Sequence, residues 1–273
     1  MFRLFTFLLL NSFALALLAQ DSPYQAYQTV RQQSQAAAQK KDYTAAISST
    51  EAFIKQHPRY SLAYLEQSTY AIKNRDVNLL KRNIIALKSQ RVDLPLDLLL
   101  TGAQLAEKKR VYQLGLEILS QATPAQAQAE AILLQRARFQ QKLNKNAEAL
   151  TTLQQAYNNN TTSNKVLQEL AAAYQNVNRR RSIQLYESLV QQKGYEDISL
   201  TALGLLYTRL YEADPSTNNK NNLVKAKSYY QQYLLRHPKD QTVKNLLQQL
   251  EILLQYPSPT CSSYFSKTFA FLL

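Results

Sequence analysis

The segments Ile198–Tyr207 (ISLTALGLLY) and Leu223–Leu235 (LVKAKSYYQQYLL) decide the fold of this chain. Large apolar residues recur in both at steps of three and four, which predicts two helices that each present one apolar face. The small Gly204 lies where two helices must approach closely, and Pro238 follows where the second helix must stop. Between the segments, the Pro, Ser and Asn content of Glu212–Asn222 (EADPSTNNKNN) predicts a lengthened loop.

The same pattern recurs along the chain with a period near 34 residues. Earlier second helices are predicted to begin at Tyr43, Val77, Tyr112, Asn146 and Arg180. One register of the first helices is always small: Ser34, Ser68, Ala103, Ala137, Ala171 and Gly204. The register four residues earlier is always apolar: Val30, Tyr64, Leu99, Leu133, Leu167 and Leu200. A register of the second helices is also apolar: Phe53, Leu87, Ala122, Ala156, Val190 and Tyr233. Such registers suit helix pairs that bury their apolar faces by stacking on neighbouring pairs.

These registers resemble the tetratricopeptide repeat (TPR) pattern of a large residue, a leucine, a small residue and a tyrosine, then alanines and a terminal proline. The resemblance implies an all-α fold, a right-handed α-solenoid of about six helix pairs whose concave groove mostly binds proteins. The array is expected over residues 24–238, with units near 27–60, 61–94, 96–129, 130–163, 164–196 and 197–238. Residues 239–255 are expected to form a capping helix, with Asp240 as its N-cap.

The two ends of the sequence differ from the repeats. Residues 1–19 contain an apolar run from Leu4 to Ala19, which is short for a spanning helix and typical of a secretory signal. We therefore expect a cleaved signal peptide and a periplasmic or secreted protein; an uncleaved N-terminal anchor is the alternative. The tail, residues 256–273, ends in an apolar run and stays unassigned. It contains Cys261, and this single cysteine permits neither an internal disulfide nor a cysteine-based zinc cluster.

No enzyme signature appears in the sequence. It lacks a Walker A loop, a G-x-G-x-x-G motif and a G-x-S-x-G motif. The two histidines, His57 and His237, precede the prolines of equivalent turns and are expected to be turn residues rather than metal ligands. We expect no catalytic residue, metal or cofactor; an undetected enzyme is the alternative. The tyrosines on packing registers are expected in the core: Tyr64, Tyr174, Tyr207, Tyr230 and Tyr233.

The net charge of +13 makes acidic partners plausible. Basic residues recur in the turn between the two helices of each unit, and equivalent turns line up along one edge of a solenoid. We therefore predict a basic rim made of Lys40, Lys41, Arg75, Lys109, Arg110, Lys145, Arg179, Arg180 and Arg181. Such a rim would contact anionic lipid, lipopolysaccharide or an acidic polymer. The alternative is that these cations complement helix dipoles and keep the surface soluble.

The predicted groove is a wall of amides and cations, which bind peptide backbone and carboxylates. Its residues are Arg31, Gln35, Gln39, Lys73, Gln104, Lys108, Arg138, Gln141, Lys142, Gln168, Gln175, Asn176 and Arg209. An ordinary solvated helix face is the alternative. We expect a non-catalytic protein–protein interaction scaffold of the cell envelope that binds an extended or acidic protein segment. The other function considered is a binder of anionic polysaccharide or envelope surface in polymer export or assembly. A nucleic acid partner is not expected.

Overall fold

A computed structural model describes residues 23–160, 162–215 and 219–255 of the protein. These residues form helices joined by turns, with no strand among them, so the all-α prediction is confirmed. The described residues divide into two compact units, one within 23–143 and the other within 144–255. The predicted signal peptide, residues 1–19, and the tail that holds Cys261 lie outside the described residues.

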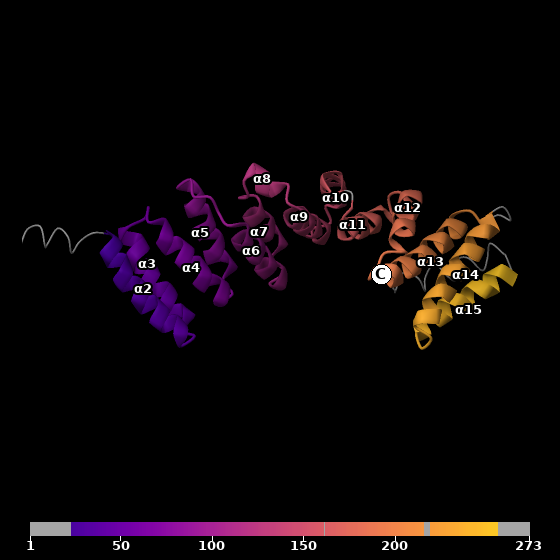
Figure 1. Ribbon diagram of the computed structural model, residues 1–273, viewed down its shortest axis with the longest axis horizontal. Coiled ribbons are helices and arrows are strands. Elements are labelled where there is room, and N and C mark those ends of the chain that lie inside the picture. Colours follow the sequence, from indigo (N-terminus) through magenta and orange to yellow (C-terminus); the bar gives the residue numbers. More distant parts are fainter. Residues whose placement is uncertain (1–22, 161, 216–218, 256–273) are drawn as a thin grey trace, which may run out of the picture. The chain divides into compact units, whose positions relative to one another are not determined.

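The first unit is a stack of helices in chain order (Figure 1). They are α2 (Pro23–Gln39), α3 (Tyr43–Gln56), α4 (Ser61–Lys73), α5 (Val77–Ser89), α6 (Leu96–Lys108), α7 (Tyr112–Leu119), α8 (Pro124–Ala127) and α9 (Glu130–Lys142). Neighbours in sequence pack on each other from α2 to α7, and α4 also packs on α6 and α6 on α9. One continuous core therefore runs through the unit, with Tyr27, Leu80, Leu99 and Phe139 among its buried members.

The second unit repeats this arrangement. It holds α10 (Asn146–Asn159), α11 (Asn164–Tyr174), α12 (Arg179–Leu189), α13 (Glu196–Ala213), α14 (Lys220–Arg236) and α15 (Gln241–Gln255). Each helix packs on the next, and α15 packs on α14 (Figure 1). An ion pair of 2.8 Å between Lys227 and Glu251 joins these two helices. The side chain of Asp240 accepts the Val243 N–H at 3.1 Å, which confirms Asp240 as the N-cap of α15.

The small register of the first helices is confirmed. All six of its residues, from Ser34 to Gly204, are buried. At Gly204 an added Cβ would overlap the ring of Tyr230, so the close approach of α13 and α14 requires glycine. Four predicted helix starts, Tyr43, Val77, Tyr112 and Asn146, are also confirmed, and the fifth lies at Arg179, one residue before Arg180.

The third predicted repeat, near residues 96–129, ends differently from the prediction. Its second helix, α7, stops at Leu119, so Ala122 lies beyond the helix and not on its apolar register. Thr123 and Gln126 then form a capping box that starts the four-residue helix α8. The two hydrogen bonds of this capping box satisfy backbone N–H groups at the start of a new helix. The 34-residue period did not indicate this helix.

The predicted loop over residues 212–222 is wrong at both ends. Helix α13 continues through Ala213, and α14 begins at Lys220. Tyr211 and Leu223 are buried on these added turns, so the core extends both helices into the polar segment. The two helix ends are joined by a hydrogen bond, in which Asn219 donates to the carboxylate of Asp214 at 2.6 Å.

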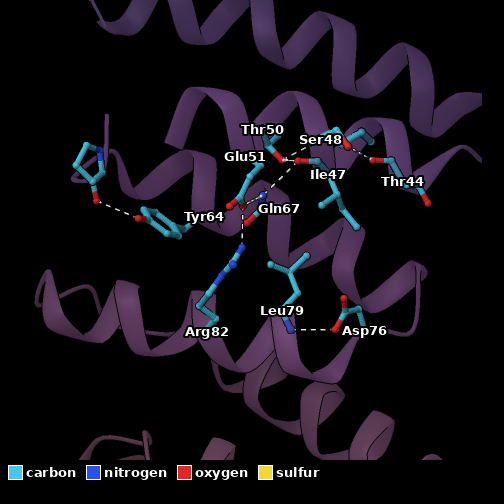
Figure 2. A network of polar contacts seen from close by, with 12 residues as sticks. Thr44, Ile47, Ser48, Thr50, Glu51, Tyr64, Gln67, Asp76, Leu79 and Arg82 are labelled. Atoms are coloured by element: carbon cyan, nitrogen blue, oxygen red, sulfur yellow. Dashed lines mark hydrogen bonds and ion pairs between the residues drawn. The ribbon is translucent and has the colours of Figure 1, made fainter. Parts of the chain in front are cut away.

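A partly buried polar network joins the first two helix pairs (Figure 2). Glu51 of α3 accepts hydrogen bonds from Gln67 of α4 at 3.0 Å and from Arg82 of α5 at 2.7 Å. Gln67 also donates to the Ile47 carbonyl at 3.3 Å. Because Gln67 is fully buried, these bonds offset the loss of water around its amide nitrogen and fix how α4 lies on α3.

Candidate functional site

A cavity of about 560 Å³ lies in the first unit between α2 and α4. These are the first helices of neighbouring pairs. Four predicted groove residues line it: Arg31, Gln35 and Gln39 from α2, and Lys73 from α4. All four side chains are exposed. The structure therefore brings these four residues together, while their role in binding stays a prediction.

The carboxylate of Glu66 lies in this cavity and is held by hydroxyl groups. Tyr27 donates to one carboxylate oxygen at 2.6 Å, and Tyr70 donates to the other at 2.7 Å. Ser34 donates to the same oxygen as Tyr70, at 3.2 Å. Burial, followed by the bond to Glu66, raises the pKa of Tyr27 and raises that of Tyr70 to about 12, so both phenols stay protonated donors at neutral pH. Sequence reasoning missed this cluster, because its members come from separate registers of α2 and α4.

The cations of the cavity are available to a ligand. Within the described part of the chain, neither Arg31 nor Lys73 forms an ion pair with a carboxylate. The Lys73 ammonium lies 5.8 Å from the centre of the Tyr43 ring, which is within the range of a cation–π contact. The cavity thus presents two cations and two exposed amides around a carboxylate already engaged by three hydroxyls.

The other predicted groove residues are spread over both units. Gln104 and Lys108 line a second cavity of the first unit, and Arg138, Gln141 and Lys142 lie on α9. In the second unit, Gln168 lies on α11, Asn176 follows that helix and Arg209 lies on α13. Gln175 lines a cavity of about 500 Å³ whose walls include Ile198, Leu205, Val243 and Leu246. The second-unit cavity is therefore largely apolar, unlike the predicted wall of amides and cations.

Three residues of the predicted basic rim share an unusual backbone conformation. Lys41, Arg75 and Arg110 have φ values of 61°, 57° and 58°. Each follows the first helix of a pair, and the next residue donates back to a helix carbonyl, as Asp76 N–H does to Ala71 at 2.8 Å. This is the C′ position of a helix, which glycine usually occupies because it bears no Cβ. The rim prediction located these turns but gave no sign of their left-handed backbone.

The second-unit part of the rim needs a correction. Arg179, Arg180 and Arg181 form the first turn of α12 rather than the turn before it. The Asn178 side chain caps this helix by accepting the Arg181 N–H at 3.0 Å. Cations at a helix N-terminus oppose the dipole, so the dipole explanation does not apply to these arginines. Lys145 stands at the N-cap of α10 and pairs with Glu148 at 3.8 Å.

The predicted core tyrosines divide into two groups. Tyr64, Tyr207 and Tyr230 are buried, which confirms their assignment. Tyr174 and Tyr233 are only half-buried, so the core prediction is wrong for these two. Their hydroxyls reach polar partners at the surface: Tyr174 accepts from Gln154 at 2.6 Å, and Tyr233 donates to Asp240 at 2.9 Å.

Both histidines are turn residues, as predicted. His57 and His237 are the C-caps of α3 and α14, and each donates its backbone N–H to the residue four positions earlier. Their rings lie against aromatic neighbours, with centroid separations of 4.6 Å to Phe53 and 4.7 Å to Tyr233. Across the described ranges, no three His, Cys, Asp or Glu side chains gather closely enough to hold a metal ion. None of the described helices combines the length and apolarity needed to cross a membrane.

Comparison with solved structures identifies the class of fold. The C-terminal part of a TPR repeat-containing protein from Cytophaga hutchinsonii superposes with a TM-score of 0.53 at 14% identity, covering 90% of this chain and 98% of the other. In the described part of this chain, consecutive helix pairs bury the small register of their first helices. The chain therefore has the tetratricopeptide-repeat fold, as the sequence resemblance implied.

Two further solved structures are similar at lower scores. A tetratricopeptide repeat protein from Parabacteroides merdae has a TM-score of 0.48 and 15% identity, covering 82% of this chain and 98% of its own. PilF from Pseudomonas aeruginosa has a TM-score of 0.47 and 16% identity, covering 82% of this chain and 97% of its own. The sequence matches no protein-family model and no curated protein.

Proposed function

We propose that the protein is a non-catalytic protein–protein interaction scaffold of the cell envelope. It binds an extended, acidic segment of a partner protein in the first-unit cavity between α2 and α4. The observation that carries this proposal is the convergence of Arg31, Gln35, Gln39 and Lys73 on one cavity. The cations attract carboxylates of the segment, and the amides bond its backbone.

Glu66 is the one carboxylate among the residues that line this cavity. Its two oxygens already accept bonds from Tyr27, Tyr70 and Ser34. These three hydroxyls spread its charge and hold it at a fixed position. The lining then carries two cations, Arg31 and Lys73, against this one carboxylate, and its net charge of +1 favours an acidic segment.

Capture of envelope extract on the purified protein, at low and at high salt, tests this proposal. The charge-reversed variant carries Arg31→Glu and Lys73→Glu. Its matched control carries Lys55→Glu and Arg59→Glu, which remove the same charge from exposed positions of the same unit outside this cavity. We expect one defined protein to be retained by the parent and the control and lost by the cavity variant, with weaker retention at high salt because the cavity cations are exposed. Equal retention by both variants would contradict the assignment of the cavity.

Envelope location rests on the predicted signal in residues 1–19. Its test is fractionation of cells that express the full chain, with mass measurement of the product. We expect a periplasmic or secreted protein shortened near Ala19. An intact N-terminus in a membrane fraction would favour the uncleaved anchor instead.

The basic rim supports a second candidate function, binding of anionic polysaccharide or envelope surface in polymer export or assembly. In the first unit, Lys41, Arg75 and Arg110 occupy equivalent turn positions where the backbone favours glycine. Retention only of polysaccharide or lipid, lost at high salt, would favour this function over the protein scaffold, because exposed charge pairs are screened by salt.

A further inference from the structure

A second cavity of the first unit gathers three cations. It measures about 430 Å³ and lies between the C-terminal end of α4 and the helix α6. The cations are Arg75, Lys108 and Lys109, and all three are exposed. The other lining residues are Ile72, Thr101, Gln104 and Leu105. No carboxylate is among the lining residues, and within the described ranges none of the three cations forms an ion pair.

The carboxylates nearest in sequence are occupied by structural bonds. Asp76, next to Arg75, caps α5 by accepting the Leu79 N–H at 2.9 Å. Glu107, next to Lys108, accepts from the buried Gln135 at 2.9 Å. Within the described ranges, neither carboxylate forms an ion pair with a cation of the cavity.

The backbone at Arg75 allows its side chain to be removed without loss of the turn. With φ at 57°, Arg75 holds a left-handed conformation that costs an L-residue with a side chain about 1 kcal/mol or more and costs glycine nothing. The turn is closed by backbone bonds alone, from Arg75 N–H to Ile72 at 3.1 Å and from Asp76 N–H to Ala71 at 2.8 Å. The turn would therefore form at least as well with glycine, and arginine is not required for the fold.

We propose that this cavity binds a phosphate monoester group. Such a group carries nearly two negative charges at neutral pH and three acceptor oxygens, which match the three cations better than the single charge of a carboxylate. The guanidinium of Arg75 suits two oxygens at once, and the lysines supply point charges. Thr101 and Gln104 add neutral donors, while Ile72 and Leu105 face the carbon atoms of the ester. The cavity exceeds the size of the ion itself, which leaves room for the small alcohol that carries it.

This site does not depend on the protein partner proposed for the α2–α4 cavity. It involves none of the residues that line that cavity. If one proposal fails, the other is therefore unaffected. The Arg31 and Lys73 variants test partner binding, and the Arg75 variant tests phosphate binding.

Calorimetric titration of the full chain at fixed ionic strength tests the proposal, with glycerol 3-phosphate, inorganic phosphate and acetate as probes. We expect glycerol 3-phosphate to bind at least tenfold more tightly than acetate, and more weakly at pH 5.5, where the ester loses its second charge. Equal binding of acetate, or no binding of the ester, would overturn the proposal. Binding of inorganic phosphate without the ester would assign the cavity to the free ion and contradict the ester.

The variant Arg75→Gly separates binding from folding. It removes the cation and gives the turn its preferred residue, so we expect at least tenfold weaker binding of glycerol 3-phosphate with no fall in Tm. Lys41→Gly is the matched control, since Lys41 has the same backbone conformation 34 residues earlier and does not line the cavity. We expect this control to bind as the parent does. An equal loss in both variants would indicate non-specific charge attraction, and no loss in either would remove Arg75 from the site; both results count against the proposal.

Discussion

At the scale of single residues, the buried Asn83 lowers the stability of the first unit. It is fully buried on α5, and neither atom of its amide has a hydrogen-bond partner in the described structure. A buried amide without partners costs about 1–3 kcal/mol. We expect Asn83→Leu, which has a similar shape, to raise the free energy of unfolding by part of this amount in urea titration. A loss of stability would show that the amide makes bonds in solution.

Tyr70 links stability to alkaline pH. Burial, then its bond to Glu66, raises its pKa from 10.0 to about 12 in the folded chain. The unfolded chain therefore releases the proton first, so the contribution of Tyr70 to stability is complete below pH 10 and is lost as pH rises to 12. We expect the free energy of unfolding to fall across this window, and less steeply in Tyr70→Phe. An unchanged slope would show that Tyr70 does not titrate as inferred.

The Tyr70→Phe variant also has an effect at neutral pH. It removes a hydrogen bond to a carboxylate, an interaction that contributes about 1.5–3 kcal/mol. Tyr27→Phe is the matched comparison, because Tyr27 donates to the other oxygen of Glu66. Both variants also alter the walls of the α2–α4 cavity, so partner capture by these variants should be compared only after their stability is known.

At the scale of elements, the capping helix α15 depends on the charge of Asp240. Its backbone bond to Val243 and the hydroxyl of Tyr233 hold the pKa of Asp240 below its ordinary value of 3.8. Its stabilising effect is therefore complete above pH 3.8 and is lost as pH falls through the lower, folded value. We expect amide hydrogen exchange in α15 to accelerate in this acid range. Asp240→Asn, which keeps a capping oxygen, should weaken that acid response, whereas Asp240→Ala should speed exchange already at neutral pH.

The arginines that open α12 give a prediction of the opposite kind. Arg180 is exposed in the first turn of this helix, where its charge opposes the dipole. We expect Arg180→Glu to stabilise the second unit by about 0.3–1 kcal/mol, measured by thermal unfolding at low salt, and less at high salt. Lys193, exposed beyond the end of α12, is the control position, because Lys193→Glu makes the same charge change away from the helix start. Equal gains in both variants would point to net charge rather than to the dipole.

The elements show how far sequence reasoning reaches. Helix positions followed from the repeat because each pair must bury one face, and the small register from Ser34 to Gly204 marks where the helices touch. The structure departs from the repeat pattern at two places. After α7, the capping box of Thr123 starts the short helix α8. Near the polar segment 212–222, the buried side chains of Tyr211 and Leu223 lengthen α13 and α14. In the α2–α4 cavity, the repeat spacing alone predicted that Arg31 and Lys73 line the groove. The hydrogen bonds of Glu66 could not be predicted in this way, because they involve residues of two helices and neither helix shows a sequence pattern for them.

At the scale of the whole molecule, each compact unit carries its own core and its own kind of cavity. The first unit holds the α2–α4 cavity and the Arg75 cavity, which are both lined by cations, and the second holds the mainly apolar cavity beside α13 and α15. The predicted fourth repeat supplies α9 to the first unit and α10 to the second. Because stability in repeat proteins arises from contacts between neighbours, the two units need not unfold together.

Two glycine substitutions test whether the units unfold separately. A Cβ at Gly115 of α7 would overlap the buried ring of Phe139, and one at Gly204 of α13 would overlap that of Tyr230. Overpacking of this kind costs about 1–3 kcal/mol, more than the 0.5–1 kcal/mol that alanine gains over glycine in a helix. We expect Gly115→Ala to speed hydrogen exchange in α6–α9 and leave α13–α15 unchanged, and Gly204→Ala to do the reverse. Faster exchange in both units from either variant would show that the chain unfolds as one cooperative body, and the cavities of the first unit would then depend on the packing of the second.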